Sequence, residues 1–184
     1  MTAQPHSVRR ALPAEAEAIA ALQRRSWSQV YPEAVAGRLL SGTDLAQMTD
    51  AWSAAIQRPP LATLRVLVAV DSSDGRHRVV GFAAVGPSDD PDASPDSDGT
   101  VAEFAVDPAA QRLGHGSRLL QACVDTLRAD GFTRATWWVR STDDPLRGFL
   151  TGAGWGPDGA HLERGGDQDS QGVKFVRLHT DISA

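Results

Sequence analysis

The sequence contains one cysteine, one tyrosine and no long apolar run. Because Cys123 is alone, an internal disulfide and a cluster of cysteine metal ligands are excluded. No stretch of about 18 apolar residues is present that could cross a membrane. Residues 1–7 lack an apolar segment after a basic start, which is the pattern of a secretory signal. We therefore expect a cytoplasmic protein with no membrane partner.

Basic residues are also fewer than acidic ones, 18 against 23, which gives a net charge of -5. Nucleic-acid binding draws much of its strength from basic side chains that displace counterions, so no nucleic-acid partner is expected. The charge suits a cationic acceptor such as a free amine, although net charge concerns steering and not chemistry. The 184 residues, 41% of them hydrophobic, fit one globular domain over residues 1–184.

Apolar periodicity and breaker residues predict a helical first third followed by strands. Pro13 with acids after it marks a helix start, Thr43 is a candidate N-cap, and Pro59 ends the helix that begins there. From Arg65 onward the residue pattern is typical of the strands and turns of a sheet. The expected helices cover 33–40, 43–58, 116–130 and 144–150, and the expected strands cover 7–12, 66–70, 79–85, 100–106, 135–139 and 173–178.

Residues 86–99 have an unusual composition, with five aspartates and three prolines among fourteen residues. Such a segment cannot bury a core, so we predict a mobile loop with few buried contacts. A calcium loop is an alternative, because the spacing of Asp96, Asp98 and Gly99 fits in part. Ser94 stands at the first ligand position and no glutamate at the last, so a loop without a metal is favoured.

The helix expected at 116–130 has a clear apolar face. Leu119, Cys123 and Leu127 recur at helical spacing, which places the cysteine on the buried side in a structural role. Gly131 is expected to end the helix, because glycine adopts the left-handed conformation found just beyond many helices.

The segment from Glu103 to Ser117 is a strand that leads through a turn into this helix. The start of a helix presents N–H groups without intrahelical partners beside the positive end of its dipole, which is a binding site for phosphate. Gly114 and Gly116 let an anion approach the backbone, and Arg112 can add a charge-assisted contact. Close strand-to-helix packing without a ligand is the alternative.

Two common phosphate motifs are absent from this turn. A P-loop is excluded because no Gly-Lys-Ser/Thr follows the glycines. The third glycine of a dinucleotide fingerprint is replaced by Leu119, and the turn follows a hairpin instead of opening a βαβ unit.

Residues 111–116, Gln-Arg-Leu-Gly-His-Gly, resemble the Gln/Arg-x-x-Gly-x-Gly/Ala motif of the GCN5-related N-acetyltransferases. A Val-Asp-Pro precedes it, as it often does at the end of the family's fourth strand. Trp27 with Tyr31, the strand at 79–85 and residues 149–159 match further family features in the same order. The resemblance covers nearly the whole chain. It implies a mixed α/β domain with a central, mostly antiparallel, splayed sheet flanked by helices.

The resemblance also implies an activity. Acetyl-CoA would be the co-substrate, without a metal, and a small-molecule or peptide amine would attack the thioester directly. Backbone groups of Phe104, Ala105 and Val106 would hold the pantetheine arm, with an N–H near the last two stabilising the oxyanion. His115 is expected to contact solvent or phosphate. The pyrophosphate would be bound by Gln111, Arg112, Leu113, Gly114, His115, Gly116 and Ser117.

Two positions depart from the family pattern. The frequent tyrosine, which protonates the leaving thiolate, aligns with Leu150, and the frequent asparagine after the fifth strand aligns with Asp143, a further candidate for cofactor binding. A thiol with a pKa of about 8.5 can leave as its anion, and water or Ser141 are alternative donors. A CoA-binding module without turnover, or a transferase for a bulkier acyl group, therefore remain alternatives.

Glu103 is the candidate general base. Strand alternation places it on one face with Val101 and Ala105, and a charge within an apolar strand suits the edge of a cleft. The alternative is a glutamate that faces solvent or pairs with an arginine. Trp137 and Trp138 are expected in the core and as sheet cover. The acceptor pocket would use residues 27–61 and 86–100, and a homodimer is compatible with the sequence.

Overall fold

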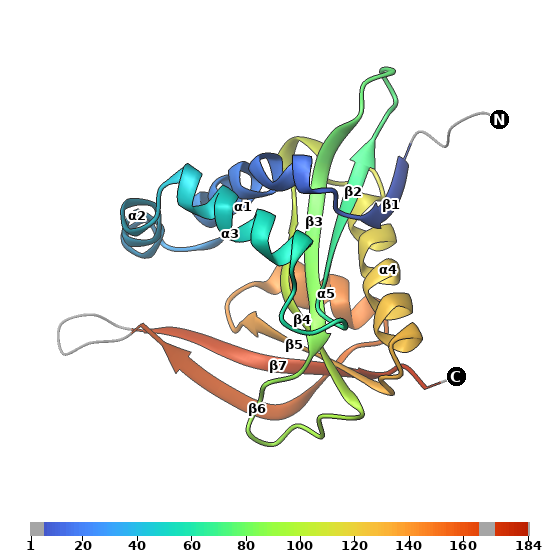
Figure 1. The fold of residues 1–184 in the computed structure, drawn as a ribbon. Helices are drawn as coiled ribbons and strands as arrows, with labels where there is room; N and C mark the ends of the chain where they lie inside the picture. Colours follow the sequence, from blue (N-terminus) through green and yellow to red (C-terminus); the bar gives the residue numbers. More distant parts are fainter. Residues whose placement is uncertain (1–5, 166–171, 184) are drawn as a thin grey trace. The chain divides into compact units, whose positions relative to one another are not determined.

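The structure is a computed structural model that describes residues 6–165 and 172–183. The chain divides into two compact units, one comprising residues up to Val85 together with Glu103–Thr126, the other Gly86–Ala102 together with the residues from Leu127 onward. In chain order the elements are β1 (His6–Arg10), a 3₁₀ turn η1 (Pro13–Glu15), α1 (Ala16–Val30), α2 (Glu33–Gly42), α3 (Leu45–Gln57), β2 (Arg65–Asp71), β3 (Arg78–Pro87), β4 (Asp98–Val106), η2 (Pro108–Ala110), α4 (His115–Ala129), β5 (Arg134–Arg140), α5 (Asp144–Gly152), β6 (Gly156–Arg164) and β7 (Val173–Asp181) (Figure 1).

The seven strands form one sheet in the order β1-β2-β3-β4-β5-β7-β6. The pairs β1–β2, β2–β3, β5–β7 and β6–β7 are antiparallel. Strands β4 and β5 run parallel, with Thr100 opposite Thr136. The expected mixed α/β class, with a mostly antiparallel sheet and flanking helices, is confirmed. Both β3 and β4 contribute residues to the two units.

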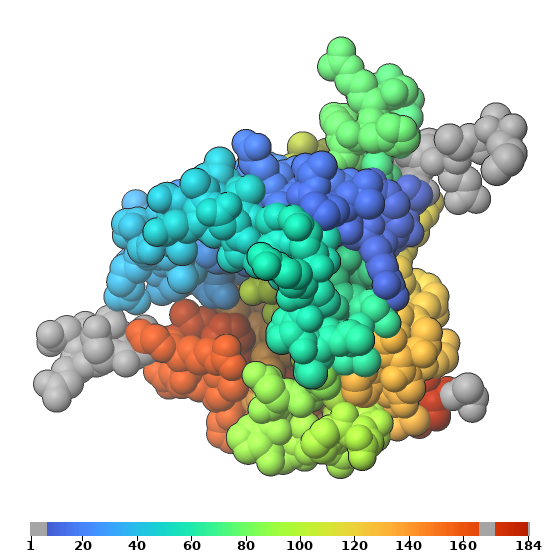
Figure 2. Space-filling model, viewed as in Figure 1, coloured from blue at the N-terminus to red at the C-terminus, as the bar shows by residue number. Residues whose placement is uncertain are grey.

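The core of the first unit lies between the first and third helices and the strands beside them. Ile19 and Leu22, three residues apart on α1, are fully buried against Val68 and Phe82. Full burial of such a side chain contributes about 1.5–3 kcal/mol. On α3, Trp52 packs edge-on against Phe82, with ring centroids 5.1 Å apart. Figure 2 shows α1 to α3, blue to cyan, side by side on the surface of this unit.

The start of α3 differs from the prediction. Asp44, and not Thr43, is the N-cap: its carboxylate accepts a hydrogen bond of 2.7 Å from the Gln47 N–H, and the Asp44 N–H donates in turn to Oε1 of Gln47. Thr43 instead donates from its hydroxyl to the Leu39 carbonyl, 2.9 Å away, at the end of α2. Thr43 and Asp44 are both residue types that cap helices. The pair of hydrogen bonds between Asp44 and Gln47 makes Asp44 the N-cap of α3.

The predictions for α4 are confirmed. Cys123 is fully buried, and burial raises the pKa of its thiol to about 12, so it stays protonated at neutral pH. Gly131, with φ of 96°, terminates the helix. Its N–H bonds to the Arg128 carbonyl, and the Phe132 N–H bonds to the Leu127 carbonyl at 3.1 Å. This pair of bonds is the Schellman arrangement that satisfies the last carbonyls.

The sequence missed β6, the edge strand of the second unit. Gly156, Pro157 and Gly159 all favour a turn, and the pairing of β6 with β7 does shift register between Pro157 and His161. Figure 1 shows β6 and β7 as a long two-stranded ribbon. The prediction for Trp137 is confirmed: it is buried and meets Trp155 edge-on at 6.2 Å.

The segment between β3 and β4, residues 88–97, does not behave as expected. Ser88 within it is buried, and so is Asp98 just after it. Asp90 accepts a hydrogen bond of 2.9 Å from the indole N–H of Trp138, a half-buried residue of β5. The prediction of a loop with few buried contacts is therefore wrong. The contacts come from β5 and β7, far along the chain, and local composition does not reveal them.

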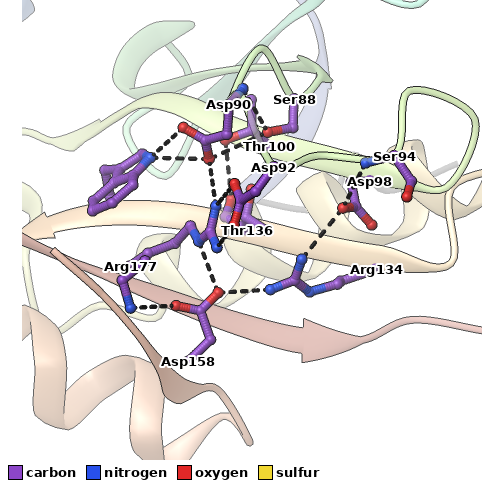
Figure 3. A network of polar contacts seen from close by, with 12 residues as sticks. Ser88, Asp90, Asp92, Ser94, Asp98, Thr100, Arg134, Thr136, Asp158 and Arg177 are labelled. Atoms are coloured by element: carbon purple, nitrogen blue, oxygen red, sulfur yellow. Dashed lines mark hydrogen bonds and ion pairs between the residues drawn. The ribbon is translucent and has the colours of Figure 1, made fainter.

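The side chain that organises this segment is Arg177 of β7 (Figure 3). Its guanidinium donates to Asp90, Asp92 and Asp158 and lies over the ring of Trp138, 5.5 Å from the centroid. Asp98, a residue of the considered calcium loop, accepts hydrogen bonds from the Ser94 N–H and from Arg134. The aspartates that looked like solvated charges are thus partners of arginines. Among the described helices none is long and apolar enough to cross a membrane.

Candidate functional site

The turn between β4 and α4 is fixed at its first residue. The Asp107 N–H donates to the Val80 carbonyl of β3 at 2.7 Å, and the Asp107 carboxylate accepts from the Ala109 N–H, which closes η2. The other oxygen of the same carboxylate accepts a hydrogen bond of 2.7 Å from Arg25 of α1. The backbone N–H of Asp107 therefore joins the turn to β3, and its carboxylate joins the turn to α1, all within the first unit.

Two residues of the turn adopt left-handed backbone conformations, Arg112 with φ of 63° and Gly114 with φ of 83°. Arginine rarely adopts this conformation, which costs about 1–2 kcal/mol without a glycine, and such strained residues cluster at ligand sites. Left-handed residues turn successive N–H groups toward one side and create a concave anion site. Helix α4 begins directly afterwards, with the Arg118 N–H bonded to the Gly114 carbonyl.

The side chains of the turn take three different positions. Leu113 is 54% exposed and Gln111 is exposed. His115 is 2% exposed, so the expectation that its ring contacts solvent is wrong. As the first residue of α4 it turns its imidazole inward, and only its backbone N–H belongs to the predicted phosphate turn. Arg118, one helical turn on, donates to the Leu113 carbonyl at 3.4 Å.

A cavity of about 760 Å³ is lined by residues of α1, of the β2–β3 hairpin and of the turn itself. Its charged lining is paired internally. Arg25 contacts Asp107 at 2.7 Å, and Arg78 contacts Asp71 at 3.3 Å. Because these arginines already have carboxylate partners, the backbone turn is the better anion site of the two.

Strand β4 places Glu103 four residues before this turn. Its side chain is exposed to solvent. Desolvation by the surrounding atoms nevertheless raises the pKa of its carboxyl, while the polar side chain of Gln23 acts in the opposite direction. Neighbouring protein atoms thus replace part of its hydration shell. A carboxylate in this setting is a better proton acceptor than one in water.

Backbone atoms of β4 are closely packed at Ala105. A Cβ added at Gly81 of β3 would lie 3.1 Å from the Ala105 carbonyl oxygen, so a glycine lets β3 approach this part of the strand. Ala105 itself is buried. The first unit therefore brings Glu103, Phe104, Ala105 and Val106 into one strand that runs directly into the residues 111–117.

The remaining predicted residues belong to the second unit. Asp143 is the N-cap of α5: its carboxylate accepts from the Leu146 N–H at 3.1 Å and contacts Arg140 at 3.4 Å. Leu150 is fully buried. The position of the family's tyrosine thus holds a core side chain that cannot donate a proton.

The model of the acetyltransferase (GNAT) family matches residues 18–155, three quarters of the chain, and this span includes β4, the turn and α4. The chain belongs to the GNAT family. Its resemblance to the GCN5-related N-acetyltransferases is confirmed. No curated protein matches this chain in sequence.

Solved structures of acetyltransferases share the fold of this chain. A GCN5-related N-acetyltransferase from Kribbella flavida is 22% identical with a TM-score of 0.71, and the match covers 96% of this chain and 98% of that one. For yncA from Salmonella typhimurium, solved with its cofactor acetyl-CoA, identity is 17%, the TM-score 0.71 and the coverage 98% and 95%. An N-acetyltransferase from Staphylococcus aureus is 17% identical with a TM-score of 0.73, and the match covers 98% of this chain and 100% of that one.

Some residues of this GNAT protein's site were not singled out from the sequence. Trp52 of α3 donates to Gln23 of α1, Arg25 binds Asp107, and Gly81 lets the strands approach. A polar residue beside Leu22 on the buried stripe of α1 was the one available signal for Gln23. The other three contacts depend on tertiary packing.

Proposed function

We propose that this GNAT protein binds acetyl-CoA at the β4–α4 turn and transfers the acetyl group to an amine nitrogen. The observation that carries the proposal is the pair of left-handed residues, Arg112 and Gly114, directly before α4. An amide-lined turn at a helix start fits the pyrophosphate of a nucleotide thioester. Acetyl-CoA in the similar yncA structure, and the family match, support the same ligand class.

The proposed binding roles use backbone groups for most contacts. Phe104, Ala105 and Val106 hold the pantetheine arm, and an N–H of the last two stabilises the oxyanion of the tetrahedral intermediate. The pyrophosphate is bound by amides of residues 111–117, with the exposed guanidinium of Arg112 at the rim. Asp143, by its family position, is proposed as a further contact with the cofactor, although its carboxylate already caps α5.

Glu103 is the proposed general base. It removes a proton from the ammonium form of the acceptor, and the neutral nitrogen then attacks the thioester carbonyl carbon. The C–S bond breaks and the thiolate of CoA leaves as an anion, since a thiol pKa of about 8.5 makes it a stable leaving group near neutral pH. The nitrogen gives its second proton to water, which leaves a neutral amide. Water or Ser141 can return a proton to the sulfur. No step requires the missing tyrosine.

A second candidate function, CoA binding without turnover, is favoured by Leu150. A fully buried leucine at the family's acid position would suit a protein that senses or stores acyl-CoA. Acetyl transfer to an acceptor would distinguish the transferase from the binding module. We propose that this acceptor is a small-molecule or peptide amine.

Titration calorimetry with acetyl-CoA and a turnover assay test these functions together. The assay follows release of the CoA thiol with polyamines, amino acids, aminoglycosides and a peptide with a free α-amine. Micromolar binding with thiol release for at least one amine supports the transferase. Tight binding without release for any amine supports the binding module, and absence of binding overturns both. Propionyl- and butyryl-CoA in the same assay test whether a bulkier acyl group is preferred.

A further inference from the structure

Asp107 places a negative charge beside the phosphate turn, the residues 111–117 that are proposed to bind an anion. It is the N-cap of η2, and its side chain is only 22% exposed. Leu113 of the turn lines the same cavity as Asp107. A carboxylate in this place would repel the phosphates of a nucleotide, because like charges repel more strongly where water is partly excluded.

Arg25 of α1 offsets this charge. Its Nη2 donates to Oδ2 of Asp107 at 2.7 Å, which is the distance of a charge-assisted hydrogen bond. Of the described residues, Arg25 is the only cation that forms an ion pair with Asp107. Both residues belong to the first unit.

The same contact orients the carboxylate. While Oδ2 is held by Arg25, Oδ1 accepts a hydrogen bond of 3.1 Å from the Ala109 N–H. The Asp107 N–H donates to the Val80 carbonyl at 2.7 Å, so both the backbone and the side chain of this residue are fixed. The left-handed Arg112 follows in the same turn. Such strained conformations persist only where the surrounding contacts determine them.

We propose that Arg25 is a positioning residue for the phosphate turn: it orients and neutralises Asp107, so that this carboxylate stabilises the turn without repelling the pyrophosphate of acetyl-CoA. Arg25 acts through Asp107 and does not itself touch the cofactor. The inference rests on the proposed binding of acetyl-CoA at the β4–α4 turn. An aspartate can then serve as the cap of η2 in a place where its charge alone would weaken anion binding.

The other charged groups of the cavity are paired with one another. Arg78 contacts Asp71 at 3.3 Å, and Glu15 accepts hydrogen bonds of 2.7 and 2.9 Å from Arg9. Arg78 closely matches Arg25, because their side chains are 56% and 51% exposed and each meets its carboxylate through one nitrogen. The difference is that only the partner of Arg25 caps the start of the turn.

The first test compares the Kd of acetyl-CoA by calorimetry. Arg25→Met leaves Asp107 without its cation, so Kd should rise by about fivefold to tenfold, the effect of one uncompensated charge near an anion. Arg25→Lys should restore most of the affinity, because the contact uses a single nitrogen. Arg78→Met is the matched control: it removes the same charge from the same cavity and should leave Kd unchanged.

The double variant Arg25→Met with Asp107→Asn tests the charge itself. Asparagine can still accept from the Ala109 N–H but carries no charge, so Kd should return close to that of the parent. The ratio of Kd between Arg25→Met and the parent should also shrink when salt is raised from about 0.05 to 0.5 M. A double variant that binds as weakly as Arg25→Met would overturn the proposal.

Hydrogen exchange of the Ala109 amide, followed by NMR, tests the positioning role in the absence of cofactor. Exchange should be faster in Arg25→Met than in the parent or in Arg78→Met, because the carboxylate that accepts this N–H is no longer held. In turnover with the fastest amine, Arg25→Met should raise the KM of acetyl-CoA and leave kcat unchanged, which a general loss of stability would not do.

These measurements separate the inference from the proposed function. An unchanged Kd in Arg25→Met overturns the inference, even if the exchange of Ala109 is faster. A raised Kd with unchanged exchange leaves neutralisation and overturns the orienting role. If the parent does not bind acetyl-CoA, the proposed function fails, while the exchange of Ala109 still decides whether Arg25 orders the turn. Arg25→Lys carries the exchange and binding tests if circular dichroism shows that Arg25→Met is unfolded.

Discussion

The guanidinium of Arg177 donates two hydrogen bonds of 2.6 Å to the two carboxylate oxygens of Asp92. This bidentate pair joins β7 to the segment 88–97, and Asp90 and Asp158 complete the set of acceptors. The Arg177 side chain is buried, so its charge depends on these carboxylates.

We expect Arg177→Met to lower the free energy of unfolding by about 2–3 kcal/mol, because the carboxylates lose their shared cation and remain partly desolvated. The methionine stem keeps the contact with Trp138, so the loss reflects charge and not volume. The thermal midpoint should fall by about 5–10 °C in a domain of this size. Differential scanning calorimetry measures both quantities.

Arg147→Met in the same unit is the control. Arg147 contacts Asp144 at 3.4 Å, but that carboxylate is 87% exposed, and exposed pairs contribute about 0–1 kcal/mol. Equal midpoints for the two variants would show that the contacts of Arg177 add no stability.

The same network predicts how stability depends on pH. The hydrogen bond from Arg177 lowers the pKa of Asp92 to about 2. For Asp158, desolvation is outweighed by hydrogen bonds from the Ala160 N–H and from Arg177, so the pKa of Asp158 is lowered as well. A carboxyl with a lowered folded-state pKa stabilises the protein above its unfolded pKa of about 4, and this contribution disappears as the pH falls toward 2.

Denaturant titrations between pH 6 and pH 2.5 should therefore show a steep loss of stability below about pH 4. Arg177→Met should flatten this dependence, so that the difference between the two proteins becomes smaller as the pH falls. Parallel curves over the whole range would contradict the assignment of the acid sensitivity to these carboxylates.

The sequence predicted the elements whose signals are local. The helix with Leu119, Cys123 and Leu127 on one face, its terminating Gly131, and the strand–turn–helix that contains Gly114 all follow from spacing and turn chemistry. The segment 88–97 was mispredicted because Asp90 and Asp92 meet Arg177 of β7, and Asp90 also accepts a hydrogen bond from Trp138 of β5. Gln23 was missed for a similar reason, since its hydrogen-bond donor Trp52 lies on α3.

Gly116→Glu should abolish acetyl-CoA binding without unfolding the protein. A carboxylate in the first turn of α4 would occupy the anion site and repel phosphate. Gly116 is the better of the two glycines for this test, because Gly114 has φ of 83° and any side chain there is strained. Isothermal calorimetry gives the affinity, and circular dichroism checks the fold.

Gly116→Gln is matched in size and adds no charge, so it should bind acetyl-CoA more tightly than Gly116→Glu. Unchanged affinity in Gly116→Glu would sink the assignment of this turn. An equal loss in both variants would mean that crowding, and not charge, excludes the ligand.

Glu103→Gln tests the base, and it should separate turnover from binding. The amide cannot accept the proton, so kcat should fall by about 10²-fold or more, while the Kd of acetyl-CoA is unchanged because the thioester is bound by other groups. The acidic limb of the pH–rate profile should disappear, since the raised pKa of the Glu103 carboxyl is what produces that limb in the parent. Glu17→Gln, an exposed glutamate on α1, is the control and should retain the limb.

The same variant should be at least as stable as the parent at pH 8. A carboxyl whose folded-state pKa is raised favours folding when protonated, and this contribution is lost as the pH rises from its unfolded value through its folded value. The ionised carboxylate of Glu103 therefore lowers the stability of the folded parent at pH 8, and glutamine removes this penalty. The difference in midpoint between Glu103→Gln and the parent should accordingly shrink toward pH 4.

If turnover stays within about threefold of the parent from pH 6 to 9, against the 10²-fold expected of a base, Glu103 is a structural residue. The amine must then reach the thioester already neutral.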